Sequence, residues 1–533
     1  MNKLLHYNSI KLLEQLRALD QERMQLNRAA AVLRWDQETC LPPDGIEDRA
    51  EQLAVLEGLA HEKLINPKIG ELLDHPAILG WITADLQSES SGGEPSLAVV
   101  RSADGSGGFP AGDFLRVLRR DYEKALKLPG DFVRESARAE GISQAAWVQA
   151  RKQKDFAAFA PHLEKMIDYA QQKAEYWGWG QNGRTVYDGL LDFYEPGLGA
   201  GEIAAIFGPL RETLSLLLKK IAVRPKPESG FLYQQYDVNK QNAFCREVLE
   251  ALGFDFRRGR LDISTHPFTT TLGFNDVRIT TRYAQNDPLS GLFSVIHEAG
   301  HAFYEFGIAP ALRSSCLAEG TSMGIHESQS RLWENVIGRS RSFWRFWFPR
   351  FKEYFPDQLE ATDFDAFYRA VNSIIPGPIR VEADEISYSL HIILRFELEE
   401  RLFAGKLTVN ELPSAWNKAM KDYFGIECTD DAEGVLQDVH WSMGAFGYFP
   451  SYALGNLYGL QFWEKLKEDI PETEAALERQ EYGEIHAWLR KNIHQKGRCA
   501  EPAALIKEVT GRELSEKYFL RYIEKKYTEL YGL

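Results

Sequence analysis

Apolar side chains recur at helical spacing along most of the 533-residue chain. The first apolar stripe begins at Leu12 and Leu16, resumes at Met24 and continues to Trp35. The Pro- and Gly-containing stretch 41–45 then interrupts it. The same periodicity predicts amphipathic helices near residues 53–64, 114–127, 131–140, 145–175 and 201–222. Beyond about residue 304 it predicts helices again to the end of the chain, apart from short turns such as 375–378.

The helical pattern shows no internal repeat and no change of composition that would mark a second domain. One stretch interrupts it, because Ser and Gly crowd residues 88–112 without any periodicity. Since the helical pattern returns at Phe114, we expect a flexible surface insertion there rather than a linker. The sequence therefore predicts one large, mostly α domain over residues 1–533.

A second stretch, residues 276–283, alternates in the manner of a β-strand. Val277 and every second residue after it share one face, while Asp276 and Arg278 begin a polar face. A Gly-Phe-Asn turn directly before the strand predicts a hairpin that folds back toward Thr269. The polar face could wall an active site, or the hairpin could be purely structural, and the pattern does not decide between the two.

Composition narrows the class of protein. The net charge of −15 argues against nucleic acid or an anionic membrane as the main partner. Five cysteines lie far apart without a Cys-x-x-Cys pair, which argues against a disulfide framework and against a thiolate zinc site. We find no signal peptide in the first residues and no apolar run long enough to span a membrane. These features predict a soluble, cytoplasmic enzyme.

The chemistry that stands out is the stretch His297-Glu298-x-x-His301, with apolar residues on both sides. On a helix of about 3.6 residues per turn, the two imidazoles lie one above the other and can bind one zinc ion. Glu298 lies beside them, where it could act as general base on a water molecule. The alternative is a buried helix with two hydrogen-bonded histidines, and we favour the metal site.

A catalytic zinc site needs a third protein ligand. Glu305 shares the face of the two histidines, but three ligands on one helix would span about 12 Å, which is too far for one ion. The third ligand should therefore come from another helix, and a carboxylate is expected. Glu319, Glu327 and Glu334 are candidates, and Glu327 is favoured because its surroundings predict a helix.

The order of short motifs resembles the thermostable-type carboxypeptidases, known as the carboxypeptidase Taq or M32 metallopeptidases. The similarity covers nearly the whole chain, with 88–112 as the exception. Besides the histidine pair, it rests on Trp35-Asp36-Gln37-Glu38-Thr39, His266-Pro267-Phe268, Asp276-x-Arg278-x-Thr280, His326-Glu327-Ser328-Gln329, Ile379-Arg380-x-x-Ala383-Asp384, Gly434-x-x-Gln437-Asp438-x-His440-Trp441 and Gly447-Tyr448-Phe449-Pro450-Ser451-Tyr452.

The resemblance implies an almost wholly helical fold with a long active-site groove and a small antiparallel sheet, related to neurolysin-like and angiotensin-converting-enzyme-like peptidases. It implies a homodimer that releases single residues from peptide C-termini with broad specificity and disfavours C-terminal proline. It also implies zinc as the metal, for which cobalt can substitute. Glu327 matches the position of the family's third metal ligand.

The resemblance also assigns roles around the metal. Arg380 is expected to bind the substrate carboxylate, and His266 to lie in the substrate site. The alternative for Arg380 is a structural salt bridge to Glu382, Asp384 or Glu385. Asp276 and Asp384 could orient a ligating imidazole.

The spacing of His440 and Tyr452 is similar to that of a His–Tyr pair in neurolysin-like relatives, so both are expected to donate hydrogen bonds to the tetrahedral oxyanion. Tyr448 is the reserve candidate. An aromatic core patch around Trp441 is the alternative. At the level of function, the rivals are an endo-acting oligopeptidase of the same architecture and a catalytically silent peptide-binding protein, against which Glu298 argues.

Overall fold

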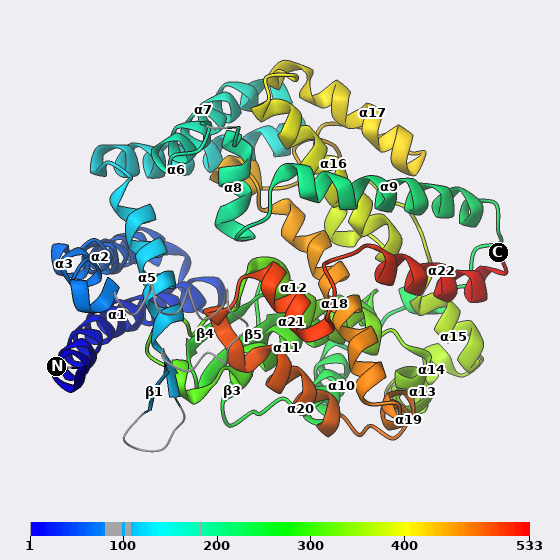
Figure 1. Cartoon of the computed structure of the whole chain (residues 1–533). Helices are drawn as coiled ribbons and strands as arrows, with labels where there is room; N and C mark the ends of the chain where they lie inside the picture. Colours follow the sequence, from blue (N-terminus) through cyan, green and yellow to red (C-terminus); the bar gives the residue numbers. More distant parts are fainter. Residues whose placement is uncertain (1, 80–98, 102–107, 182) are drawn as a thin grey trace. The chain divides into compact units, whose positions relative to one another are not determined.

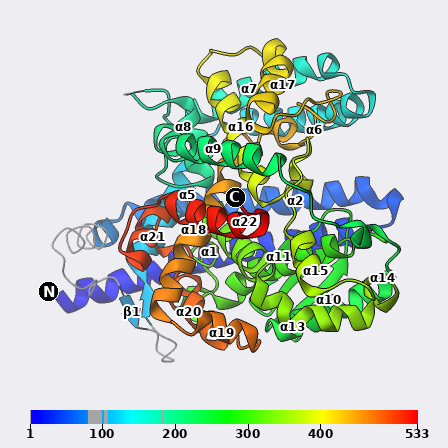
Figure 2. The ribbon, with the colours of Figure 1, turned by 90° about the vertical axis from the view of Figure 1, so that its right-hand side faces the viewer.

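The computed structural model describes residues 2–79, 99–101, 108–181 and 183–533. Helices dominate this part of the chain (Figures 1 and 2), which confirms the predicted mostly α fold. Contacts group the chain into two compact units. No described helix combines the length and the apolar character that crossing a membrane requires.

The first unit comprises Met1–Lys127, Tyr236–Thr321 and Gln480–Glu501. Its elements are α1 (Asn2–Thr39), η1 (Pro43–Gly45), α2 (Ile46–Leu64), α3 (Pro67–Leu73), β1 (Val99–Arg101), β2 (Gly108–Pro110), α5 (Ala111–Leu126), α10 (Val238–Ala251), β3 (Gly259–Ile263), β4 (Thr269–Gly273), β5 (Asp276–Thr281), α11 (Pro288–Gly307), η3 (Pro310–Leu312), α20 (Gly483–Asn492) and η8 (His494–Cys499).

The second unit comprises Leu128–Gln235, Ser322–Arg479 and Pro502–Leu533. Its elements are α6 (Gly130–Gln153), α7 (Phe156–Tyr176), α8 (Val186–Tyr194), α9 (Ala200–Ala222), η2 (Gly230–Tyr233), α12 (Met323–Arg331), the π-helical turn η4 (Leu332–Ile337), α13 (Arg341–Tyr354), α14 (Pro356–Leu359), α15 (Phe364–Val371), η5 (Arg380–Glu382), α16 (Glu385–Phe403), η6 (Val409–Glu411), α17 (Leu412–Phe424), η7 (His440–Met443), α18 (Phe449–Asp469), α19 (Thr473–Glu478), α21 (Pro502–Thr510) and α22 (Lys517–Tyr531).

One helix boundary differs from the prediction. The sequence predicted a break between residues 140 and 145, but α6 continues to Gln153. Lys154 ends it in the left-handed conformation, with φ of 59°, and Asp155 caps α7 by accepting a hydrogen bond of 3.2 Å from the Ala158 N–H. A cap at this point, rather than a loss of apolar periodicity, therefore separates the two helices.

The predicted hairpin is present, because β4 and β5 pair in antiparallel fashion. The sheet is nevertheless mixed rather than antiparallel, since β3 joins the other edge of β5 in parallel, in the order β3-β5-β4. The sequence did not indicate β3 because five residues are too few for a clear alternation.

The two faces of this sheet have different surroundings. The apolar face, which includes the fully buried Val277 and Ile279, packs on α11. On the other face, Arg278 and Arg260 stack on Trp35 of α1, with guanidinium carbons 4.3 and 5.0 Å from the ring centroid. The predicted polar face therefore contacts α1, and the apolar face is the one that lies against the histidine helix.

Most of the predicted insertion at 88–112 lies outside the described residues. Its described parts include a short antiparallel pair, β1 with β2. Phe109 of β2 is only 2% exposed and packs edge-on against Phe114, with ring centroids 5.3 Å apart. The C-terminal end of this stretch is thus part of the core of the first unit.

Candidate active site

Helix α11 carries the two histidines. Asp287 caps its N-terminus by accepting hydrogen bonds from the N–H groups of Leu289 (3.2 Å) and Ser290 (3.1 Å), and a proline occupies the first turn. The helix is buried on nearly all sides, as its apolar sequence requires. His297 and His301 lie one turn apart, and their ring centroids are 5.0 Å apart.

Helix α12 carries Glu327. Its N-terminus is capped by Ser322, which accepts a hydrogen bond of 3.1 Å from the Ile325 N–H. The buried carboxylate of Glu195 accepts a second bond from the Gly324 N–H, and burial raises the pKa of Glu195 to about 7. These contacts fix the first turn of α12, one turn ahead of Glu327.

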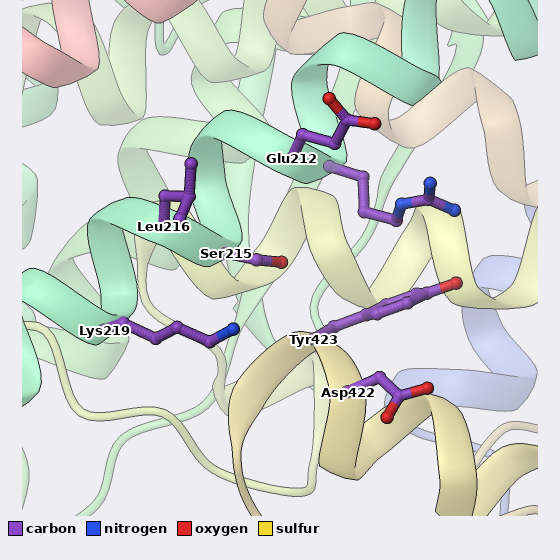
Figure 3. Close-up of a pocket in the computed structure, with 7 residues that line it drawn as sticks. Glu212, Ser215, Leu216, Lys219, Asp422 and Tyr423 are labelled. Carbon is purple, nitrogen blue, oxygen red and sulfur yellow. The ribbon is translucent and has the colours of Figure 1, made fainter.

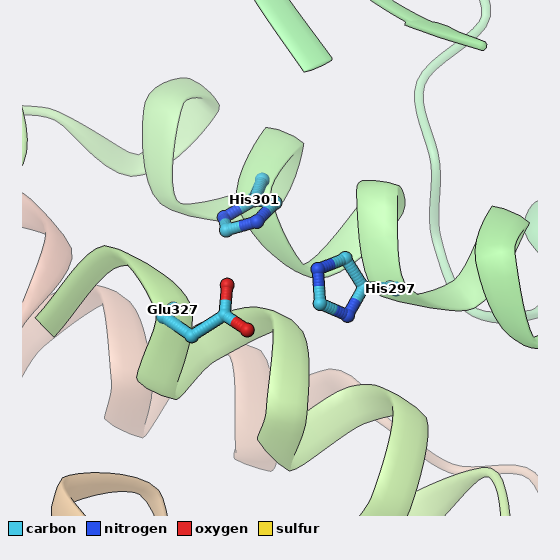
Figure 4. A group of neighbouring side chains, drawn as sticks. All are labelled: His297, His301 and Glu327. Atoms are coloured by element: carbon cyan, nitrogen blue, oxygen red, sulfur yellow. The ribbon is translucent and has the colours of Figure 1, made fainter. Parts of the chain in front are cut away.

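The side chains of His297, His301 and Glu327 converge (Figure 4), and their ligand atoms all lie within 4.8 Å of one another. Two imidazoles and one carboxylate are a donor set suited to a catalytic zinc ion, which keeps an open position for water or substrate. The other two candidates have different partners: Glu319 pairs with Arg498 (3.5 Å) and Glu334 with Arg331 (3.3 Å). The donor set of the described residues thus fits a metal ion.

The carboxylates of Glu298 and Glu327 each have a hydrogen-bond partner that the sequence analysis did not name. The Thr269 hydroxyl donates a hydrogen bond of 2.6 Å to Oε2 of Glu298, whose side chain is buried. Arg331 donates a bond of 2.7 Å from Nε to Oε1 of Glu327. Arg331 follows Glu327 by one helical turn, so this spacing was a usable signal. The Thr269 contact joins a strand to a helix and has no local signal.

Arg380 lies in η5 and is 6% exposed. Its Nε and Nη2 donate hydrogen bonds to the Asp438 carboxylate, the shortest of 2.8 Å, and this leaves Nη1 for another acceptor. Arg395 binds the same carboxylate, with a bond of 2.7 Å from Nε. Burial lowers the pKa of Arg395 to about 10, so it stays protonated at neutral pH. The buried trio therefore carries two positive charges and one negative.

The salt bridge given as the alternative role of Arg380 is present, but none of the three partners named for it forms it. Asp384 caps α16 by accepting hydrogen bonds from the N–H groups of Ile386 (3.0 Å) and Ser387 (2.8 Å). Glu385 accepts a bond of 2.7 Å from Lys526. The actual partner, Asp438, is far away in sequence, and local spacing could not have indicated it.

His440 and Tyr452 are in contact, with 3.2 Å between His440 Nε2 and the Tyr452 hydroxyl. The rings of Tyr448 and Tyr452 lie 5.0 Å apart. Burial lowers the pKa of His440 to about 4 in spite of the nearby Asp438, so its imidazole is neutral at neutral pH. Burial also raises the pKa of Tyr448 to about 12, which keeps that hydroxyl protonated.

The segments that carry His440 and Tyr448 are held by one buried carboxylate. Glu399 accepts hydrogen bonds from the Trp441 indole N–H (2.7 Å), the Gly447 N–H (2.8 Å) and the Tyr187 hydroxyl (2.9 Å). Trp441 directly follows His440 in the sequence, and Gly447 directly precedes Tyr448. The aromatic patch is thus real, and it also fixes the position of the polar groups within it.

His266 lies in the loop before β4, and Asp276 is the first residue of β5. The His266 side chain is exposed in the β3–β4 loop, where its carbonyl accepts a bond of 2.6 Å from Ser264. Asp276 pairs with Arg278 (2.8 Å). This ion pair accounts for the Asp-x-Arg spacing, and it does not require Asp276 to orient a ligating imidazole.

A shallow cavity of about 550 Å³ lies elsewhere, between α9 and α17 (Figure 3). Its lining includes Arg211, Lys219 and Tyr423. None of the predicted site residues lines it. This cavity is therefore not part of the site described above.

Comparison with known proteins agrees with this geometry. The sequence profile of the carboxypeptidase Taq (M32) metallopeptidases matches residues 15–527. The chain belongs to this family. Carboxypeptidase 1 of Bacillus subtilis is 39% identical over 95% of this chain and 96% of its own length. Thermostable carboxypeptidase 1 of Thermus thermophilus is 39% identical over 97% of this chain and 99% of its own.

Solved M32 structures have the same fold. The M32 carboxypeptidase of Deinococcus radiodurans matches with a TM-score of 0.90 and 38% identity, over 98% of this chain and all of that one. The Pyrococcus furiosus carboxypeptidase matches with a TM-score of 0.88 and 35% identity, over 97% of this chain and 99% of that one. The chain is therefore a metallocarboxypeptidase of M32 architecture, as the sequence motifs predicted.

Proposed function

We propose that this M32 enzyme uses zinc, for which cobalt can substitute, to release single residues from the C-termini of peptides. The observation that carries the proposal is the convergence of His297, His301 and Glu327, with Glu298 on the same helix as the histidines. Broad side-chain specificity with C-terminal proline disfavoured, a homodimer and a cytoplasmic location are further proposals, which rest on the family resemblance alone.

The donor set supports zinc on chemical grounds. Two neutral imidazoles and one carboxylate would leave a bound Zn²⁺ ion with a net charge of about +1. When bound, the ion supplies Lewis-acid chemistry, since it lowers the pKa of a water molecule and polarises a carbonyl group. Arg331 donates a hydrogen bond of 2.7 Å to Oε1 of Glu327, and Ser330 donates one of 3.2 Å to its Oε2. Such outer partners orient a ligand toward its ion.

Glu298 is the proposed general base. As water attacks the scissile carbonyl, Glu298 takes its proton and then transfers that proton to the leaving amine. Its buried side chain lies on α11 between the two histidines in sequence, so the base and the metal ligands are held by one rigid helix. A protein that only binds peptides would need no such base.

Arg380 is the proposed anchor for the substrate's C-terminal carboxylate. A guanidinium group suits a planar carboxylate, and Asp438 holds that group in one orientation. Among the described residues, Asp438 is the only carboxylate that Arg380 and Arg395 share, so the trio keeps one positive charge. The substrate's C-terminal carboxylate would balance that charge. This surplus favours an exopeptidase over an endopeptidase. His266, in its exposed loop, is proposed to bind substrate as well.

His440 and Tyr452 are the proposed donors to the tetrahedral oxyanion, with Tyr448 in reserve. All three side chains stay neutral at neutral pH, as hydrogen-bond donors to a developing negative charge should. Glu399 anchors the segments on which His440 and Tyr448 lie, so their positions are set before substrate binds.

The test is hydrolysis of an N-blocked dipeptide, the same dipeptide as its C-terminal amide, and an internally quenched peptide with both ends blocked. We expect free amino acid only from the acid, loss of activity with chelator and recovery with zinc or cobalt. Cleavage of the doubly blocked peptide would favour the endopeptidase. Binding without any cleavage by the zinc-loaded protein would favour a silent binding protein.

A further inference from the structure

Thr269 is the first residue of β4 and pairs directly with Ile279 of β5, on the sheet face that packs against α11. Its Oγ1 lies 2.6 Å from Oε2 of Glu298 and 3.0 Å from the Glu298 backbone oxygen. A hydroxyl group has one proton to donate, and a charged acceptor forms the stronger bond. The shorter distance to the carboxylate agrees with that preference.

We propose that Thr269 is a positioning residue for Glu298, an inference that rests on the proposed general-base role. The Thr269 hydroxyl holds Oε2 of Glu298, so the carboxylate keeps one orientation about its terminal torsion. Its Oε1 is then the oxygen that accepts the proton from water. Without this bond the carboxylate could turn about its terminal torsion, which has only broad minima. The general base would then spend less time in its productive orientation.

The sheet holds Thr269 firmly enough for this task. The Phe268 N–H donates a hydrogen bond of 3.0 Å to Thr280 Oγ1, and the Thr280 N–H returns one of 2.9 Å to the Phe268 carbonyl. The Ser264 hydroxyl lies 2.7 Å from the same Thr280 oxygen. These bonds tie the start of β4 to β5 and to the β3–β4 loop, while the β-branched side chain of Thr269 has few rotamers of its own.

A positioning role predicts a specific kinetic signature. Thr269 touches neither the three metal ligands nor the proposed carboxylate anchor in any of these contacts, so its loss should lower kcat and leave KM and bound metal unchanged. Partners of this kind usually contribute about 10- to 100-fold to activity. A merely structural residue would instead lower stability, and kcat would recover on cooling.

The experiment compares Thr269→Val, which removes the hydroxyl at nearly constant volume, with Thr269→Ser, which retains it. Thr271→Val is the matched control, because Thr271 lies two residues along the same strand and face, opposite Val277. Each variant is loaded with zinc, checked for metal content and circular dichroism, and assayed for kcat and KM on an N-blocked dipeptide.

We expect Thr269→Val to lose about 10- to 100-fold in kcat with full metal content. Thr269→Ser and Thr271→Val should retain most of the turnover. A wild-type kcat in Thr269→Val, or an equal loss in Thr269→Ser at full metal content, would overturn the proposal. Zinc-loaded Glu298→Gln distinguishes a failure of the general-base role from a failure of the positioning role. If this variant stays active, the general-base role of Glu298 fails. If it is inert while Thr269→Val is active, only the positioning role of Thr269 fails.

Discussion

Gly455 of α18 lies directly against the side chain of Glu327. A Cβ atom at position 455 would be 2.6 Å from the Glu327 Cγ and 2.8 Å from its Cβ, closer than non-bonded carbon atoms approach. One turn further along α18, Gly459 lies against the Ser328 carbonyl in the same way, with 3.0 Å for its Cβ. The two glycines let α12 pack closely on the helix that also carries Tyr452.

Gly455→Ala should therefore weaken zinc binding by about 10-fold or more, because the added methyl group displaces Glu327, the proposed third ligand. The substitution alone favours helix by about 1 kcal/mol, so a loss cannot be ascribed to helix propensity. Zinc affinity by competition with a chelator is the measurement. Gly459→Ala is the control, since its methyl group meets backbone and not the ligand. Equal zinc affinity in wild type and Gly455→Ala would show that Glu327 can move aside.

Local chemistry could be read from the sequence, and tertiary partners could not. The spacing of His297 and His301 predicts their common face, because a helix fixes it. Asp438 as partner of Arg380 had no comparable signal, because the two are 58 residues apart and meet only through packing. The close approach at Gly455 was also hidden, since one glycine in a helical pattern has many explanations. The predicted helix around Glu327 favoured it over Glu319 and Glu334, and the family resemblance then selected it.

Glu298→Gln should retain zinc and lose nearly all turnover. The amide has the same shape as the carboxylate and can still accept a bond from Thr269, but it cannot take a proton at neutral pH. Bound metal and hydrolysis are measured on the same sample. A zinc-loaded variant that turns over at the wild-type rate would remove Glu298 from the mechanism.

Glu327→Ala should lose zinc affinity, because only two imidazoles would remain. The controls are Glu319→Ala and Glu334→Ala, whose carboxylates pair with Arg498 and with Arg331. Metal content after dialysis against a weak chelator distinguishes the three. If Glu319→Ala emptied the site and Glu327→Ala did not, the assignment of Glu327 as the third ligand would be wrong.

Asp438→Asn should destabilise the fold by about 3–5 kcal/mol, because two buried arginines lose their counter-ion. Although burial alone would raise the pKa of Asp438, Arg395 and Arg380 hold it well below its usual value. The folded carboxyl thus binds its proton less readily than the unfolded one. Its contribution is present above the unfolded pKa of about 3.9 and is lost as the pH falls through the lower, folded value.

Urea unfolding of wild type and Asp438→Asn should therefore give the same stability difference at pH 5 and pH 8. Asp422→Asn is the control, because the pair of Asp422 with Lys418 is exposed and should contribute little. A difference that shrinks between pH 8 and pH 5 would mean that Asp438 titrates in that window and that the charge trio is not as described.

Arg380→Ala tests what makes this enzyme an exopeptidase. If the guanidinium group binds the substrate carboxylate in a buried setting, its loss should cost about 2–5 kcal/mol of binding or transition-state stabilisation. That corresponds to a decrease of tens to thousands-fold in kcat/KM at about 1.4 kcal/mol per decade. The kcat/KM for peptides with a free C-terminal acid should fall by this amount. The kcat/KM for C-terminal amides, which are already poor substrates, should change little. The acid-to-amide ratio of kcat/KM is therefore the decisive quantity.

Removing Arg380 also leaves Asp438 paired with Arg395 alone, so the charge of the trio becomes balanced and the fold should survive. Circular dichroism and zinc content establish that before kinetics are compared. Arg380→Lys should restore the ratio only in part, because an ammonium group offers a point charge in place of two parallel N–H donors. An unchanged ratio in a folded, zinc-loaded Arg380→Ala protein would leave Arg380 as a structural partner of Asp438. The carboxylate anchor would then have to be sought at His266 or Arg278.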